Sequence, residues 1–218
     1  MMKNSTKLLK KAEKEWKKMI SHPFLIQVGN GTIKREIFDF WLTQDYIFVR
    51  EAIRFLGALQ VKSPDYEISL VLADSFVALK NELKMFERYK SGLSSRLVPT
   101  NVCRSYVDFL VSTALTKGFE ESFAALWCAE KAYFDSWSSV KRLSKKNNPY
   151  KAFIDRWTGD EFKKYVSWIE KTLNRLLKGI PERQLRSVEK AFLITANYES
   201  QFWDMAYSEN REGTNLLQ

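Results

Sequence analysis

Cysteine and histidine are scarce in this chain of 218 residues, which contains two cysteines and one histidine. Cys103 and Cys128 are too few for a disulfide framework and too far apart for a zinc knuckle. A di-iron site in a helical bundle uses Glu-x-x-His pairs, and a haem site needs an axial ligand, yet His22 is the only imidazole. We therefore expect no metal and no cofactor, and we interpret His22 as a loop or capping residue.

Long apolar runs are also missing. A transmembrane helix needs about 20 consecutive apolar residues, whereas the longest runs here are short pieces such as Phe123–Trp127. The lysine-rich N-terminus is not followed by the apolar stretch of a secretory signal. These absences indicate a soluble, cytoplasmic protein with no membrane partner.

Acidic residues are fewer than basic ones, with 26 Asp and Glu against 35 Lys and Arg, which gives a net charge of +9 and a pI of about 9.4. Such a basic balance is typical of some nucleic-acid-binding proteins. However, the lysines between residues 5 and 20 share one face of a predicted helix whose opposite face is apolar, with Leu9, Ala12 and Trp16. The lysines are most simply a solvated face, and no helix-turn-helix, zinc-finger or RNP-type motif accompanies them. We therefore predict no nucleic-acid partner.

Proline and glycine are few, and they fall where helices would begin or end. Between them, large apolar residues recur every three or four positions, which is the period of an amphipathic helix. The predicted helices are about Ser5–Ile20, Lys34–Gln60, Ser63–Gly92, Pro99–Lys117, Phe119–Leu143, Thr158–Gly179 and Pro181–Ser208, with a loop over Ser21–Thr32. We predict one all-α domain over residues 1–218, an antiparallel bundle of about seven main helices. Residues 211–218 are predicted to be a frayed tail.

Three carboxylates interrupt the apolar faces of three different predicted helices. They are Asp45 on the face of residues 38–56, Glu130 on that of residues 123–137, and Glu199 on that of residues 192–206. If these faces converge, the bundle holds a cavity with acids on its walls and aromatic rings between them. Burial and repulsion between like charges raise carboxyl pKa values, which suits general acid–base catalysis near neutral pH.

A structural interpretation of the same three residues competes with the catalytic one. Buried charges are normally paired, so each acid could pair with an interior arginine or cap a backbone group. One such acid is readily explained in this way. Three acids on three separate apolar faces require a separate accidental pairing for each, and we therefore favour the cavity.

Five motifs in order resemble the TenA / thiaminase II family over about Leu8 to Tyr207. They are His22-Pro-Phe, the Gly29-Asn-Gly turn, Trp41-Leu-Thr-Gln-Asp-Tyr, Trp157-Thr-Gly-Asp-Glu-Phe and Tyr198-Glu-Ser-Gln-Phe-Trp-Asp-Met-Ala-Tyr. The resemblance implies a haem-oxygenase-like helical fold, a homo-oligomer that is a tetramer, and no cofactor. It also implies hydrolysis of thiamin and of its degradation product 5-aminomethyl-2-methylpyrimidin-4-amine, which yields the hydroxymethyl pyrimidine for thiamin salvage.

The resemblance also suggests roles for individual residues. Asp45 would bind the amino-pyrimidine edge, Glu199 would give a proton to the leaving amine, and Tyr106 would donate a hydrogen bond to the substrate. The other residues that we expect around the substrate are Trp41, Phe48, Tyr133 and Trp157.

One departure from the better-known branch of the family concerns its nucleophilic cysteine. Cys128 does not fall at that position, and it lies two residues, or about 200° around a helix, from Glu130. The pattern instead resembles the branch in which a glutamate replaces the cysteine, so Glu130 is the second predicted catalytic residue. We expect hydrolysis of the aminomethyl or formylaminomethyl pyrimidine, and thiamin is the less favoured substrate. The alternative is a non-catalytic pyrimidine-binding or regulatory protein on the same scaffold.

Overall fold

The computed structural model describes residues 3–93 and 97–208. These residues form ten helices and contain no strand. The helices are α1 (Asn4–Lys11), α2 (Glu13–Ile20), α3 (Pro23–Asn30), α4 (Arg35–Val61), α5 (Tyr66–Tyr89), α6 (Asn101–Thr116), α7 (Phe119–Leu143), α8 (Lys151–Thr158), α9 (Asp160–Leu176) and α10 (Glu182–Ser208). The predicted all-α fold is confirmed. The predicted frayed tail, residues 211–218, lies outside the described residues.

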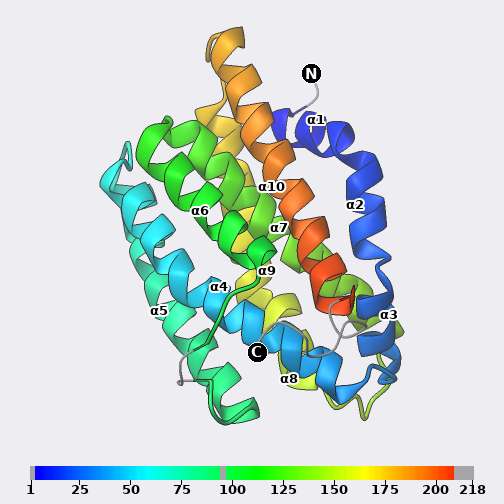
Figure 1. The fold of residues 1–218 in the computed structure, drawn as a ribbon. Coiled ribbons are helices and arrows are strands. Elements are labelled where there is room, and N and C mark those ends of the chain that lie inside the picture. Colours follow the sequence, from blue (N-terminus) through cyan, green and yellow to red (C-terminus); the bar gives the residue numbers. More distant parts are fainter. Residues whose placement is uncertain (1–2, 94–96, 209–218) are drawn as a thin grey trace.

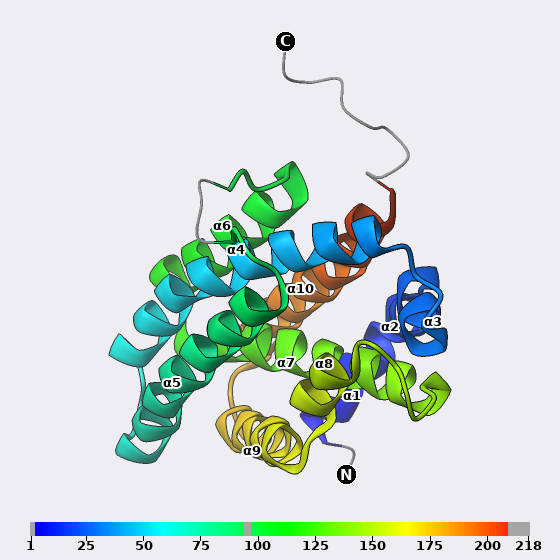
Figure 2. The ribbon, with the colours of Figure 1, turned by 90° about the horizontal axis from the view of Figure 1, so that it is seen from below.

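Helices α7 and α10 form the centre of the bundle, and the other helices surround them (Figure 1). Helices α4 and α5 lie on one side, and α9 lies on another (Figure 2). The core is rich in aromatic rings, because five of the seven tryptophans are almost fully buried: Trp41, Trp127, Trp137, Trp157 and Trp203. No helix among residues 3–93 and 97–208 combines the length and apolar character that a membrane crossing requires.

The described residues form three more helices than the seven predicted, and the local sequence explains each of the three. The first predicted helix is divided at Ala12, whose backbone leaves the helical conformation, into α1 and α2. The predicted loop over residues 21–32 contains α3, which has Pro23 in its first turn and Gly31 in the left-handed conformation at its C-terminal end. Both are recognised helix boundary signals. The short helix α8 precedes α9, and Thr158, the predicted first residue of the helix over residues 158–179, is instead the last residue of α8.

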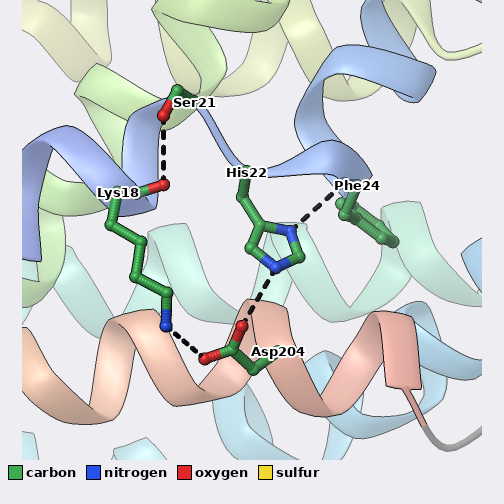
Figure 3. A network of polar contacts seen from close by, with 5 residues as sticks. All are labelled: Lys18, Ser21, His22, Phe24 and Asp204. Carbon is green, nitrogen blue, oxygen red and sulfur yellow. Dashed lines mark hydrogen bonds and ion pairs between the residues drawn. The ribbon is translucent and has the colours of Figure 1, made fainter.

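His22 joins α3 to α10, as Figure 3 shows. Its Nδ1 accepts a hydrogen bond from the backbone N–H of Phe24 at 3.2 Å, so His22 is the N-cap of α3. Its Nε2 lies 3.2 Å from Oδ1 of Asp204, while Lys18 binds the other carboxylate oxygen at 2.8 Å. Because Nδ1 accepts, the ring proton is on Nε2 and is donated to Asp204. The prediction that His22 is a capping residue is confirmed.

Helix α3 also approaches α7 closely, at Gly29. A Cβ atom at this position would lie 2.8 Å from Cβ of Leu143 and 3.1 Å from the carbonyl oxygen of Val140. Asn148 fixes the same crossing, because its side-chain amide donates to the carbonyls of Val28 and Gly29 at 2.8 and 2.9 Å. The glycine is therefore required for close helix packing, and α3 brings Phe24 against Trp203 at the bundle centre.

Candidate active site

A cavity of about 790 Å³ lies inside the bundle. Its wall includes six of the eight predicted site residues: Asp45, Phe48, Glu130, Tyr133, Trp157 and Glu199. They come from α4, α7, α8 and α10, so the three acid-bearing faces do converge. Tyr106 reaches the site by bonding Glu199. Trp41 is not part of the wall and packs behind it, with its ring centre 6.0 Å from that of Trp157.

Asp45 is the most isolated acid of the site. Its side chain is almost fully buried, the Tyr133 hydroxyl donates a hydrogen bond to Oδ1, and Oδ2 has no partner among the described residues. Burial raises the pKa of Asp45 well above its usual range, and the hydrogen bond from Tyr133 opposes this rise. A buried carboxylate oxygen without a donor is costly. Asp45 is therefore suited to accept hydrogen bonds from a ligand in the cavity.

Glu199 forms a short hydrogen bond with Tyr106. The Tyr106 hydroxyl donates to Oε1 of Glu199 at 2.5 Å, and both side chains are buried. Burial raises the pKa of Glu199 to about 8, the Tyr106 hydrogen bond opposes the rise, and the carboxylates of Asp45 and Glu130 add to it. The ring of Tyr106 is fixed between Phe48 and Tyr198, with centres 4.8 and 5.1 Å away. Glu199 thus keeps its proton at neutral pH and can donate it.

Glu130 has a raised pKa of about 8 as well. Burial is the main cause, the charge of Glu82 adds to the rise, and Arg156 and a hydrogen bond from Tyr165 oppose it. Tyr165 is in turn held by Ser75, whose Oγ lies 3.1 Å from the tyrosine hydroxyl. Hydroxyl groups of α5 and α9 therefore orient Glu130, which is the arrangement expected of a catalytic base.

Glu82 and Arg156, which were not among the predicted site residues, also line the cavity. They form an ion pair at 2.7 Å, and the Trp157 indole donates a hydrogen bond to Glu82. Pairing with an arginine, the structural interpretation, thus applies to Glu82 and not to the three predicted acids. A sequence signal existed, because Glu82 interrupts the stripe of Ile68, Leu72, Leu79 and Phe86, which recur at helical spacing in α5.

Neither cysteine belongs to the cavity wall. Cys128 Sγ faces the carbonyl oxygen of Phe192 on α10 at 3.4 Å, and burial, with the charge of Glu199 adding to it, raises the pKa of its thiol well above the usual range. Cys103 Sγ faces the carbonyl oxygen of Gln44 at 3.5 Å, and burial raises the pKa of its thiol to about 12. A thiol must ionise to be a strong nucleophile, and neither is placed to do so.

We accordingly predict that replacing both cysteines with serine retains most of the activity. Serine can keep the weak hydrogen bond that each thiol makes, so the fold should also persist. The check is the turnover rate of Cys103→Ser, Cys128→Ser and the double variant, with melting temperatures measured on the same samples. A loss of about 1,000-fold in Cys128→Ser alone, which is within the range of a positioned catalytic group, would mean that the cysteine takes part in the reaction.

The site thus combines a buried hydrogen-bond acceptor, Asp45, with two protonated carboxyls, Glu130 and Glu199. When one of these two carboxyls loses its proton and the other keeps it, the pair can act as a base and an acid in the same step. Among the residues that the structure describes, no three His, Cys, Asp or Glu side chains are grouped as metal ligands.

Comparison with known proteins gives consistent results. Residues 9–209 match the family described as TENA/THI-4/PQQC. A relative from Halalkalibacterium halodurans named aminopyrimidine aminohydrolase is 25% identical, and the alignment covers 95% of this chain and 97% of the relative. The solved structure of a TenA homologue from Pyrococcus furiosus superimposes with a TM-score of 0.89 at 38% identity, covering 94% of this chain and 100% of the homologue.

A more distant solved structure, a Shewanella denitrificans domain described as having a haem-oxygenase-like fold, superimposes with a TM-score of 0.71 at 13% identity. It covers 94% of this chain and 93% of that domain, and it confirms the predicted fold type. The family match extends over nearly the whole chain, including all the residues of the candidate site. This chain belongs to the TENA/THI-4/PQQC family.

Proposed function

We propose that this protein is an aminopyrimidine hydrolase of thiamin salvage. Its substrate would be 5-aminomethyl- or 5-formylaminomethyl-2-methylpyrimidin-4-amine, and its product the hydroxymethyl pyrimidine. The observation that carries the proposal is the convergence of Asp45, Glu130 and Glu199 on one cavity. The name of the Halalkalibacterium relative, aminopyrimidine aminohydrolase, supports the same reaction.

Asp45 binds the substrate in this proposal. Its Tyr133-bonded Oδ1 and its unpartnered Oδ2 would contact the exocyclic amine and the ring nitrogen of an aminopyrimidine. The amine donates a hydrogen bond, whereas the neutral ring nitrogen accepts one. Burial raises the pKa of Asp45, so the carboxyl brings the proton that the ring nitrogen takes up. With the proton on the ring, the carboxylate and the protonated pyrimidine form a charge-assisted pair, which is the stronger kind of hydrogen bond. Phe48 and Trp157 contribute aromatic walls beside the ring.

Glu130 and Glu199 carry out the proton transfers. Ionised Glu130 removes a proton from water, whose oxygen forms a bond to the exocyclic methylene carbon. The bond from that carbon to nitrogen breaks, and Glu199 gives its proton to the departing nitrogen. The proton that Glu130 gained returns to Glu199 afterwards, so the enzyme is unchanged after each cycle.

The direct experiment is a turnover assay with the aminomethyl pyrimidine at low enzyme concentration, with the formylaminomethyl pyrimidine and thiamin as parallel substrates. We expect many turnovers with at least one of the two pyrimidines and weaker or no cleavage of thiamin. Stoichiometric binding without product would instead support the alternative, a pyrimidine-binding or regulatory protein.

A distinct pH dependence follows from the two raised carboxyl pKa values. At pH 6 both Glu130 and Glu199 retain their protons, because both have a pKa of about 8. The first proton lost from the pair creates the base, and the second loss removes the acid. We therefore expect kcat/KM to rise from pH 6 to about pH 8 and to fall at higher pH. A profile that is already flat at pH 5 would contradict this assignment.

We also propose that the protein is a cytoplasmic homo-oligomer, and specifically a tetramer. Exposed apolar side chains on adjacent helices support assembly, because Val61 at the end of α4 and Leu70 and Val77 on α5 are 89%, 48% and 59% exposed. Leu70 and Val77 lie two turns apart on one face of α5, and exposed apolar surface of this kind can mark an interface. We expect a mass four times that of the chain by light scattering at micromolar concentration; a monomer would contradict the proposal.

A further inference from the structure

The cavity is considerably longer than an aminomethyl pyrimidine. On α4 its wall extends from Asp45 to Leu56, which is about 16 Å at a rise of about 1.5 Å per residue. On α5 it extends from Val71 to Glu82, an equal distance. Cavities of about 300–1,000 Å³ hold drug-sized ligands, whereas this substrate is a single substituted ring. A large part of the 790 Å³ therefore lies beyond the ring.

The first two levels of the cavity are set by contacts between helices. Asp45 and Tyr133 form the first level, because the tyrosine hydroxyl bonds the carboxylate. The second level contains Glu199, bonded to Tyr106, whose ring packs on Phe48 one turn along α4. Glu130 joins this second level, since it precedes Tyr133 by nearly one turn of α7.

The third level is one further turn along the same three helices. Ala52 follows Phe48 on α4, Leu110 follows Tyr106 on α6, and Leu126 precedes Glu130 on α7. All three line the cavity. The two acids therefore lie between the proposed pyrimidine site and the far end of the cavity.

The far end is apolar. Its wall is made of Ala52, Phe55, Leu56, Val71, Leu110 and Leu126. Phe55, Leu56, Leu110 and Leu126 are each less than 5% exposed. Ala52 and Val71 are partly exposed, and the exposed polar wall residues Asp74, Asn81 and Glu161 lie on α5 and α9. A departing group that leaves the ring past the acids thus meets apolar side chains of α4, α5, α6 and α7.

We propose that these six residues form a leaving-group chamber, and that the enzyme accepts aminomethyl pyrimidines whose amine nitrogen carries an apolar alkyl substituent. This inference rests on the proposed function. The reaction is the same hydrolysis: the methylene carbon–nitrogen bond breaks, water supplies the new carbon–oxygen bond, and the alkylamine departs with the proton from Glu199. No oxidant, reductant or further reactant is required.

The test is a series of 5-(N-alkylaminomethyl)-2-methylpyrimidin-4-amines with hydrogen, methyl, ethyl, propyl and butyl on the nitrogen, assayed for kcat/KM. Each buried methylene contributes about 0.8 kcal/mol, equivalent to about fourfold. We expect a rise of at least about tenfold from methyl to butyl, after correction for the solution pKa of each amine. A hydroxyl-terminated chain of the same length should lose most of this gain.

Two variants fill the chamber without touching Asp45 or the acids: Ala52→Leu and Val71→Phe. We expect each to abolish the rise with chain length while retaining turnover of the unsubstituted amine. Ala58→Leu is the matched control, since it makes the same change on α4 outside the cavity wall, and it should keep the rise. Melting temperatures establish that each variant is folded.

The outcomes separate the two proposals. Turnover of the unsubstituted amine, with kcat/KM flat or falling along the series, would overturn the proposal of a leaving-group chamber and leave the proposed function intact. A rise that persists in both filled variants would also overturn it. Absence of turnover with every compound would overturn the proposed function, and the chain-length dependence of binding, measured by calorimetry, would then test the chamber on its own.

Discussion

Glu130→Gln and Glu199→Gln are each expected to lower the single-turnover rate by about 100- to 10,000-fold, the usual contribution of a positioned acid or base. Glutamine keeps the shape of each side chain and can still accept the hydrogen bonds from Tyr165 and Tyr106, but it cannot transfer a proton. Because both residues act in one step, the double variant should lose little more than either single variant. If the rate losses of the two single variants multiply in the double variant, Glu130 and Glu199 act independently.

Stability measurements on the same samples separate catalysis from structure. Burial raises both carboxyl pKa values from 4.5 to about 8, so the folded protein binds more protons than the unfolded chain between these values. Rising pH therefore lowers stability over this range, and glutamine removes that penalty. The variants should melt no lower than the parent at pH 8. A destabilised Glu130→Gln protein with full turnover per folded molecule would end the catalytic role of Glu130.

Asp45→Asn is expected to weaken substrate binding by about 1.5–3 kcal/mol, the range for hydrogen bonds to charged groups. Asparagine preserves the shape and can accept from Tyr133 through its carbonyl oxygen, but it has no proton to give to the ring nitrogen and cannot become charged, so the charge-assisted pair is lost. The measurement is the dissociation constant of the product or of an unreactive pyrimidine analogue, obtained by calorimetry.

Tyr133→Phe is the matched control for Asp45→Asn. It removes the hydrogen bond to Oδ1 and leaves the charged group and the aromatic wall in place, so its effect on binding should be smaller. If Asp45→Asn binds the analogue as tightly as the parent does, Asp45 has no role in recognising the pyrimidine.

The convergence of the three acids could be predicted from sequence because each one interrupts a strong helical period. In α4, apolar positions recur every three or four residues on both sides of Asp45, so the carboxylate had to face the interior. Glu199 in α10 follows the same logic. Cys128 could likewise be placed away from the site, since two residues along a helix amount to about 200°.

Other parts of the site depend on contacts that no local pattern contains. Tyr165 on α9 orients Glu130 on α7, and its own partner Ser75 comes from α5. Arg156 lies on α8, a short helix in a segment where the sequence predicted none, and it pairs with Glu82 at a separation of 74 residues. Ser75, Arg156 and Tyr165 are each ordinary in their own helices. Only the packing of four helices around one cavity gives them a role.

The buried tryptophans give the molecule an optical reporter of its own. The rings of Trp137 and Trp157 stack with centres 4.7 Å apart, and Trp41 lies 5.5 Å from Trp137 and 6.1 Å from Trp203. Excitation absorbed by one indole can pass to its neighbours over such distances. Since Trp157 also forms part of the cavity wall, a ligand placed against it alters the emission of the whole group. Intrinsic fluorescence therefore follows occupancy of the cavity without any added dye.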